Sequence, residues 1–159
     1  MEELYEKLMH YSLGLLGRRA YTVKGLQDKL KIRVNRFSEA AEYHDQAILK
    51  VTERLSELKY LDDLSFAERF IAERTRLKPR GRYGLNQELR KKGISRDVLD
   101  KFWDSPAGQE FDELPLASEL LEKRSSRLKT RQKMYQFLAS RGFSVSTVRS
   151  VLDKKQIPY

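Results

Sequence analysis

The chain has 159 residues, of which 32 are Lys or Arg and 23 are Asp or Glu, so its formal net charge is +9. It contains two His and no Cys, which excludes disulfides, thiol nucleophiles and cysteine-ligated zinc. The sequence has no apolar run of about 18 residues that could span a membrane, and its acidic start is unlike a signal peptide. We therefore expect a cytoplasmic protein. Its positive charge indicates a negatively charged partner, although a basic surface can also serve solubility alone.

Basic and acidic blocks alternate along the chain. Residues 18–36, 74–101 and 123–155 are net positive, whereas residues 37–73 and 104–122 are net negative. Solvated helix faces can produce such blocks, but a threefold alternation also indicates an internal repeat.

The first repeated unit is expected at residues 1–60, with three helices. The first helix has a bulky and a small residue, two apolar residues one turn later, and an Arg after a further turn: Tyr11, Ser12, Leu15, Leu16 and Arg19. The second helix begins at the N-cap Thr22 and carries the apolar pair Leu26 and Leu30. After a polar stretch over residues 31–42, the third helix has an apolar stripe made of Ile48, Val51, Leu55 and Leu58.

The second unit, residues 61–105, repeats this order. The first-helix pattern returns as Phe66, Ala67, Phe70, Ile71 and Arg74. Ser65 and Glu68 have capping-box spacing, and we interpret the adjacent acids Asp62 and Asp63 as stabilising a helix N-terminus. The later helices are marked by Gly81, Leu85, Leu89 and Gly93, and then by Ser95, Val98, Leu99, Phe102 and Trp103.

The third unit, residues 106–159, starts with an acidic segment that contains Pro106, Gly108 and Pro115. We interpret this segment as the main linker. The three helix patterns follow in the same order: Leu116, Ala117, Leu120, Leu121 and Arg124, then Thr130, Met134, Leu138 and Gly142, then Ser144, Thr147, Val148, Val151 and Leu152. No sustained alternation predicts a strand. The predicted fold is all-α, with three tandem three-helix repeats forming an elongated, curved body.

Several segments together resemble the RecX family. They are Tyr60 to Asp63, Phe66-Ala67, the run from Gly81 to Ile94, and Leu15 to Arg19 with Thr22 and Leu26. The resemblance covers essentially the whole chain and is strongest in the second unit. It implies a regulator of the RecA recombinase that binds the groove of the RecA filament. Such a protein limits filament extension, ATP hydrolysis, strand exchange and co-protease activity.

We expect no enzyme activity, no cofactor and no metal site. His10 and His44 lack metal-ligand spacing, and no phosphate-binding G-x-x-x-x-G-K motif is present. The run from Gly81 to Gly84 has the form of a nucleic-acid-clamping G-x-x-G loop, but that module requires a sheet. We therefore interpret Gly81 as an N-cap and Gly84 as a helix position or a site of close packing.

Basic residues recur at equivalent places and are the candidate partner-binding set. Arg19, Arg74 and Arg124 each lie near the end of a first helix, where they either complement the helix dipole or contact a partner. The denser set lies at the ends of second helices and in the preceding loops: Arg18, Arg80, Arg82, Arg90, Lys91, Lys92, Arg124, Arg127, Lys129, Arg131 and Arg141. These residues face DNA phosphates, acidic patches of RecA, or both.

The alternative is a plain DNA-binding protein, because second and third helices joined by a Gly turn can imitate a helix-turn-helix. The recognition helix would offer only Arg96, Asp97, Asp100 and Lys101 as polar contacts. We therefore expect weak, sequence-independent binding to single- or double-stranded DNA by a monomer. Tyr83 and Tyr135 could stack on bases, but we interpret them as amphipathic residues at the core edge.

Overall fold

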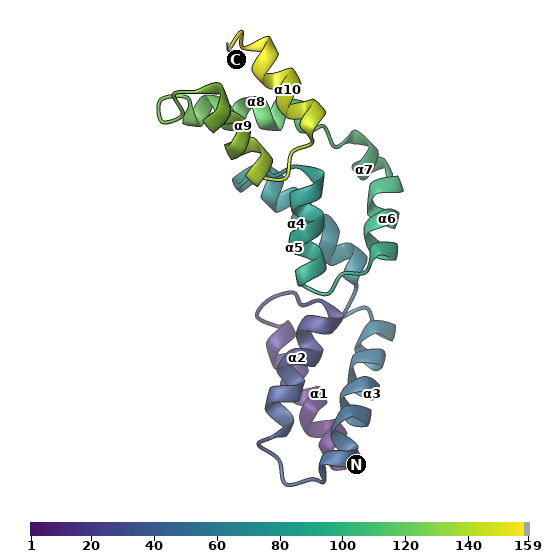
Figure 1. Cartoon of the computed structure of the whole chain (residues 1–159). Coiled ribbons are helices and arrows are strands. Elements are labelled where there is room, and N and C mark those ends of the chain that lie inside the picture. Colours follow the sequence, from purple (N-terminus) through teal and green to yellow (C-terminus); the bar gives the residue numbers. More distant parts are fainter. Residues whose placement is uncertain (158–159) are drawn as a thin grey trace.

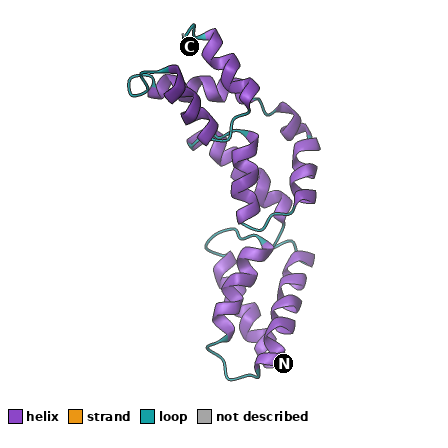
Figure 2. Ribbon diagram, in the orientation of Figure 1, coloured by secondary structure: helices purple, strands orange, loops and turns teal. Residues whose placement is uncertain are grey.

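The chain is an elongated, curved stack of helices. The computed structural model describes residues 1–157, and within this range every regular element is a helix (Figures 1 and 2). The two ends of the chain lie at opposite ends of the body (Figure 1). The predicted all-α architecture of three tandem three-helix repeats is confirmed.

The helices follow the expected order in three groups. The first group contains α1 (Glu2–Leu16), α2 (Val23–Val34), the 3-10 helix η1 (Ala41–Tyr43) and α3 (His44–Glu57). The second contains α4 (Asp63–Leu77), α5 (Arg82–Lys91), α6 (Arg96–Asp104) and the short α7 (Pro106–Glu110). The third contains α8 (Glu113–Arg124), α9 (Arg131–Ser140) and α10 (Val145–Lys154).

Each group buries its own hydrophobic core. The repeated small residues Ser12, Ala67 and Ala117 are all fully buried, so the first helix of each unit can approach its neighbours closely. The Leu pairs of the second helices also lie in these cores, for example Leu85 and Leu89 in α5. The body is therefore held together by three separate apolar clusters rather than by one.

The predicted ends of the second helices are confirmed. Thr22 accepts a hydrogen bond from the Gly25 amide, and Gly81 is the N-cap of α5. Gly93 and Gly142 follow the last turns of α5 and α9 with φ of 89° and 79°. Glycine adopts this left-handed conformation without a Cβ clash, so it ends each helix sharply.

Two local predictions at helix ends are wrong. α4 begins at Asp63 because the Asp62 side chain, not the expected Ser65, caps it, and Asp62 accepts from the Ser65 amide. Leu58 is not a core residue: it is 47% exposed, at the end of α3.

The acidic segment is not a loose linker. Ser105 caps α7, and Pro106 occupies its first turn, where a missing N–H costs nothing. α8 then begins at Glu113, so Pro115 also lies in a first helical turn. Only Phe111 and Asp112 separate α7 from α8.

The two joints between units are built in the same way. At the first, the Thr22 hydroxyl donates to the Lys92 carbonyl (2.6 Å), and the Asp63 carboxylate accepts from the Val23 amide (2.9 Å). These bonds connect the N-terminus of α2 with the C-terminus of α5 and the first residue of α4. The joint is polar and depends on backbone groups.

At the second joint, α5 takes the place of α2. The Gly81 amide donates to the Arg141 carbonyl (3.0 Å), and the Glu113 carboxylate accepts from the Arg82 amide (2.8 Å). A Cβ on Gly84 would lie 2.7 Å from the Arg141 carbonyl oxygen. The G-x-x-G run is thus a helix start that packs against the next unit, as we interpreted it.

Asp63 gives the first joint a pH dependence. Burial raises the pKa of its carboxyl group above the ordinary value, and the negative charge of Asp62 adds to this, while the bond from the Val23 amide opposes it. The folded joint therefore takes up a proton at a higher pH than the unfolded chain does. The contribution of Asp63 to stability is fully present below about pH 3.9 and falls as the pH rises through the folded pKa.

We expect Asp63→Asn to remove this dependence, because the amide oxygen still accepts from Val23 but carries no charge. Thermal melts of both proteins from pH 4 to 7 should show the wild type losing stability relative to Asp63→Asn as the pH rises. A relative gain by the wild type over that interval would contradict the assignment. Asp63→Ala, which leaves the amide unpaired, should cost about 1–2 kcal/mol at pH 7.

Candidate partner-binding site

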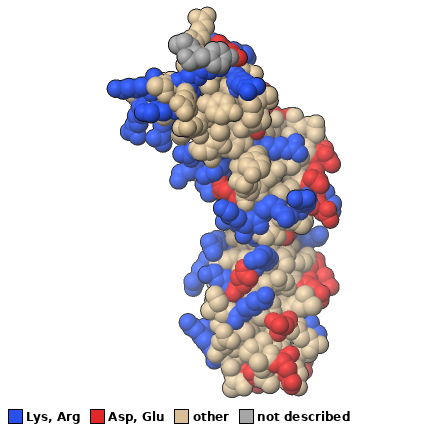
Figure 3. Space-filling model, in the orientation of Figure 1, with Lys and Arg blue, Asp and Glu red and all other residues tan. Residues whose placement is uncertain are grey.

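Positive charge gathers along one long edge of the body. In the view of Figure 3, Lys and Arg follow the edge that carries α2 and the loop between α8 and α9. Asp and Glu lie mainly toward the opposite edge, which carries α3, α6 and α7. Both charge signs are thus spread over several units.

The three repeated Arg residues lie over aromatic rings of their own units. The guanidinium carbon is 4.4 Å from the Tyr21 ring centre for Arg19, 5.0 Å from the Phe70 ring for Arg74, and 5.8 Å from the Phe137 ring for Arg124. Each therefore contributes to local packing through a cation–π contact. Arg74 and Arg124 lie in last helical turns as expected, whereas Arg19 lies beyond the end of α1.

Three of the candidate cations form ion pairs within the protein, and two of them share one carboxylate. Arg74 and Arg80 both pair with Glu88 of α5. The Arg131 side chain is only 11% exposed, and it donates to the Ile157 carbonyl (2.6 Å) and to Asp153 (2.7 Å). These contacts fix the ends of helices and leave less charge for a partner.

The other candidates make no ion pair with a carboxylate within residues 1–157. Besides Arg19 and Arg124, they are Arg18, Arg82, Arg90, Lys91, Lys92, Arg127, Lys129 and Arg141. Arg124 and Arg141 are half-buried, and the guanidinium carbon of Arg141 lies 5.3 Å from the centre of the Phe137 ring; the rest are exposed. The structure places these charges in all three units, near the ends of α5 and in the loop between α8 and α9.

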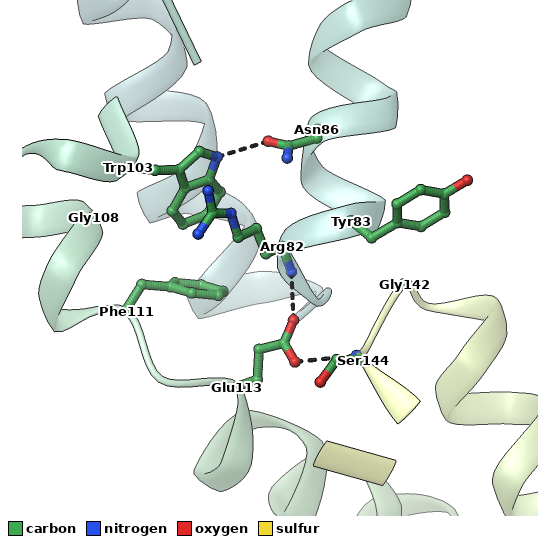
Figure 4. A pocket seen from close by; sticks show the side chains of 9 residues that line it. All are labelled: Arg82, Tyr83, Asn86, Trp103, Gly108, Phe111, Glu113, Gly142 and Ser144. Atoms are coloured by element: carbon green, nitrogen blue, oxygen red, sulfur yellow. Dashed lines mark hydrogen bonds between the residues drawn. The ribbon is translucent and has the colours of Figure 1, made fainter. Parts of the chain in front are cut away.

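Three hollows surround α5. The first, of about 460 Å³, lies at the second joint and is shown in Figure 4. There the Arg82 side chain lies over Trp103 (4.7 Å), and Trp103 Nε1 donates to Asn86 (2.8 Å). Glu113 lies below them and bonds to the Arg82 and Ser144 amides.

The other two hollows are more strongly basic. One, of about 410 Å³, is lined by Tyr83, Arg90, Lys91 and Arg96 among others. The other, of about 250 Å³, lies at the first joint and brings Arg19 and Lys29 of the first unit together with Lys91 and Lys92 of the second. The basic residues thus meet at hollows around one helix.

Family models match the second and third units. A model for the second three-helix domain of RecX matches residues 62–101, and one for the third matches residues 110–152. The "Regulatory protein RecX" of Prosthecochloris aestuarii is 38% identical over 153 residues, which cover 93% of each chain. This chain belongs to the RecX family. The "Regulatory protein RecX" of Chlorobium phaeobacteroides is 37% identical and matches 94% of this RecX chain and 93% of its own length.

The RecX fold extends over nearly the whole chain. The crystal structure of RecX from Lactobacillus salivarius superposes with a TM-score of 0.76 at 21% identity, over 97% of both chains. That likeness covers the first unit as well as the two units that the family models match. The third unit, in which the resemblance was weakest from the sequence, therefore has the family's three-helix fold.

Sequence reasoning missed two features of the basic hollows in this RecX chain. Tyr83 is not a core-edge residue: it is 65% exposed at the start of α5, whereas Tyr135 does pack against the third core. Lys29 was not a candidate, because its meeting with Lys91 and Lys92 depends on the joint between units. The only signal for Lys29 in the sequence was the positive charge of the segment that forms α2.

No three His, Asp or Glu side chains in residues 1–157 lie close enough to share a metal. Nor does any helix in that range have the length and hydropathy needed to cross a membrane.

Proposed function

We propose that this protein is a non-enzymatic regulator of the RecA recombinase that binds in the groove of the RecA–DNA filament. There it inhibits filament extension, ATP hydrolysis, strand exchange and co-protease activity. Membership of the RecX family supports this proposal. The observation that carries it is the set of cations without an ion pair that occurs in all three repeated units, near the ends of α5 and in the loop between α8 and α9.

The repeated architecture supports a multivalent mode of binding. A polymer presents the same surface at regular intervals, and linked units that each bind weakly hold it strongly together. We propose that the units 1–60, 61–105 and 106–159 each contact the filament. The polar joints would let the body adapt to the groove, where its presence blocks the addition of further subunits.

We propose different roles for the thirteen candidate cations. Those that contact the filament or its DNA are Arg18, Arg19, Arg82, Arg90, Lys91, Lys92, Arg124, Arg127, Lys129 and Arg141. Arg74, Arg80 and Arg131 instead stabilise the units, because their charges are already engaged by Glu88 and Asp153.

Reversing two charges at the end of α5 tests the proposal. We expect Lys91→Glu with Lys92→Glu to raise the concentration needed for half-maximal inhibition of RecA ATPase on single-stranded DNA roughly tenfold or more, about 1.4 kcal/mol. Both residues are exposed, so stability should change by less than about 0.5 kcal/mol. The matched control is Lys50→Glu with Lys101→Glu, which makes the same charge change on α3 and α6.

Two results would count against the proposal. If wild-type protein equimolar with RecA leaves ATP hydrolysis and filament growth unchanged, the function is wrong. If it inhibits but the Lys91/Lys92 variant inhibits equally well, the basic edge is not the contact surface.

A further inference from the structure

The three hollows around α5 adjoin one another. The first and second share Tyr83 and Asn86, and the second and third share Lys91. Together they follow α5 from the second joint to the first. We call this surface the α5 groove and define it by the residues that carry the argument: Arg82, Tyr83, Asn86, Arg90, Lys91 and Arg96.

The α5 groove is strongly positive, and its basic side chains have no carboxylate partners within residues 1–157. Arg82, Arg90, Lys91 and Arg96 make no ion pair within residues 1–157. The acids beside them are few, and two of the three already have partners in the protein. Glu113 accepts from the Arg82 and Ser144 amides and from Thr147, and Asp28 pairs with Lys24, which leaves Asp100.

The exposed aromatic ring of Tyr83 lies among these cations. Tyr83 is 65% exposed although it also lines the hollow at the second joint, and Figure 4 shows its side chain pointing away from Trp103. Its hydroxyl accepts a hydrogen bond from Gln87 one turn later (2.8 Å), which orients the ring. No stacking or cation–π contact involves this ring in the described residues.

We propose that the α5 groove binds single-stranded nucleic acid, with Tyr83 stacking on a base and the four cations contacting phosphates. An exposed aromatic ring between unpaired basic side chains suits a single strand, whose bases are free to stack. A duplex presents only its backbone to such a surface. A duplex seated on α6 would also meet Asp97 and Asp100, both exposed on that helix.

This inference rests on the proposed function, because it assigns the contact with the DNA of the RecA–DNA filament to α5. Its test nevertheless uses no RecA, so the two ideas fail separately. Binding of the full chain to a labelled single-stranded oligothymidine is measured by fluorescence anisotropy at several salt concentrations. Tyr83→Ala should weaken binding about 5- to 150-fold, the equivalent of about 1–3 kcal/mol for one stacked base.

Four comparisons make the result decisive. Tyr83→Phe keeps the ring and should bind like the wild type, and Tyr60→Ala, at another Tyr that is 57% exposed, should have no effect. Lys91→Gln should lower the slope of log K against log salt by roughly 0.7. Duplex of the same length should bind more weakly and be indifferent to Tyr83→Ala.

The proposal is overturned if Tyr83→Ala binds the single strand as the wild type does, or if duplex binds as tightly as single strand. It is also overturned if Tyr83→Ala impairs only the inhibition of RecA, because the ring would then contact protein. Circular dichroism checks that each variant keeps its helices. Because Tyr83 is exposed, its substitution should not affect folding.

Discussion

Gly84→Ala is expected to open the joint between the second and third units. Gly84 lies inside α5, where alanine would normally stabilise the helix by about 0.5–1 kcal/mol. Its new Cβ would, however, lie 2.7 Å from the Arg141 carbonyl oxygen and 3.3 Å from the Gly142 Cα. Backbone atoms cannot rotate away, so the two units must separate, at a cost of about 1–3 kcal/mol.

The opening can be measured directly. The Gly81 amide donates to the Arg141 carbonyl across this joint, so its hydrogen exchange should become faster in Gly84→Ala. Small-angle scattering should show a changed radius of gyration, while the helix content stays the same.

Gly14→Ala is the matched control. Gly14 also lies inside a helix, α1, but a Cβ there would meet no atom within 4 Å. It should therefore raise stability by about 0.5–1 kcal/mol. If the two variants shift the melting temperature in the same direction, the close contact at Gly84 does not exist in solution.

Leu89→Ala should strongly destabilise the second unit. The side chain is fully buried in that core, and a truncated Leu leaves a cavity that costs about 2–5 kcal/mol. Because the three cores are separate, we expect the loss to concentrate in α4, α5 and α6. Denaturant titration and residue-resolved hydrogen exchange measure the size and the place of the effect.

Leu77→Ala provides the comparison within the same unit. Leu77 is 57% exposed at the end of α4, so its truncation should cost less than about 0.5 kcal/mol. An equal loss in the two variants, or a loss in Leu89→Ala spread evenly over all three units, would contradict the arrangement of separate cores.

The two joints between units are polar contacts and differ in kind from the cores. Each is made of a few hydrogen bonds between helix ends rather than of a shared apolar core. Such contacts permit small changes of angle at low cost, whereas the cores keep each unit rigid. Rigid units joined by adjustable contacts suit the proposed binding to the groove of a helical filament.

Much of the fold was predictable from the sequence because helices depend on local signals. The apolar spacing located the buried Ala67 and Ile71, and the N-cap and glycine positions located the ends of α5 and α9. Where local signals competed, prediction failed. Asp62 and Ser65 were both suitable caps, and the acidic segment with Pro106 and Pro115 read as a linker although proline is well suited to a first helical turn.

The sequence by itself determined the helical repeats and the excess of positive charge, whereas the separation of the three cores came from the structure. Tertiary structure alone decided which charges remain available and where they meet. Arg74 and Arg80 both pair with Glu88, and Lys29 lines the same hollow as Lys91 because one joint brings α2 to α5. The reason is physical: a helix pattern depends on neighbours within one turn, whereas an ion pair or a groove depends on the packing of distant segments.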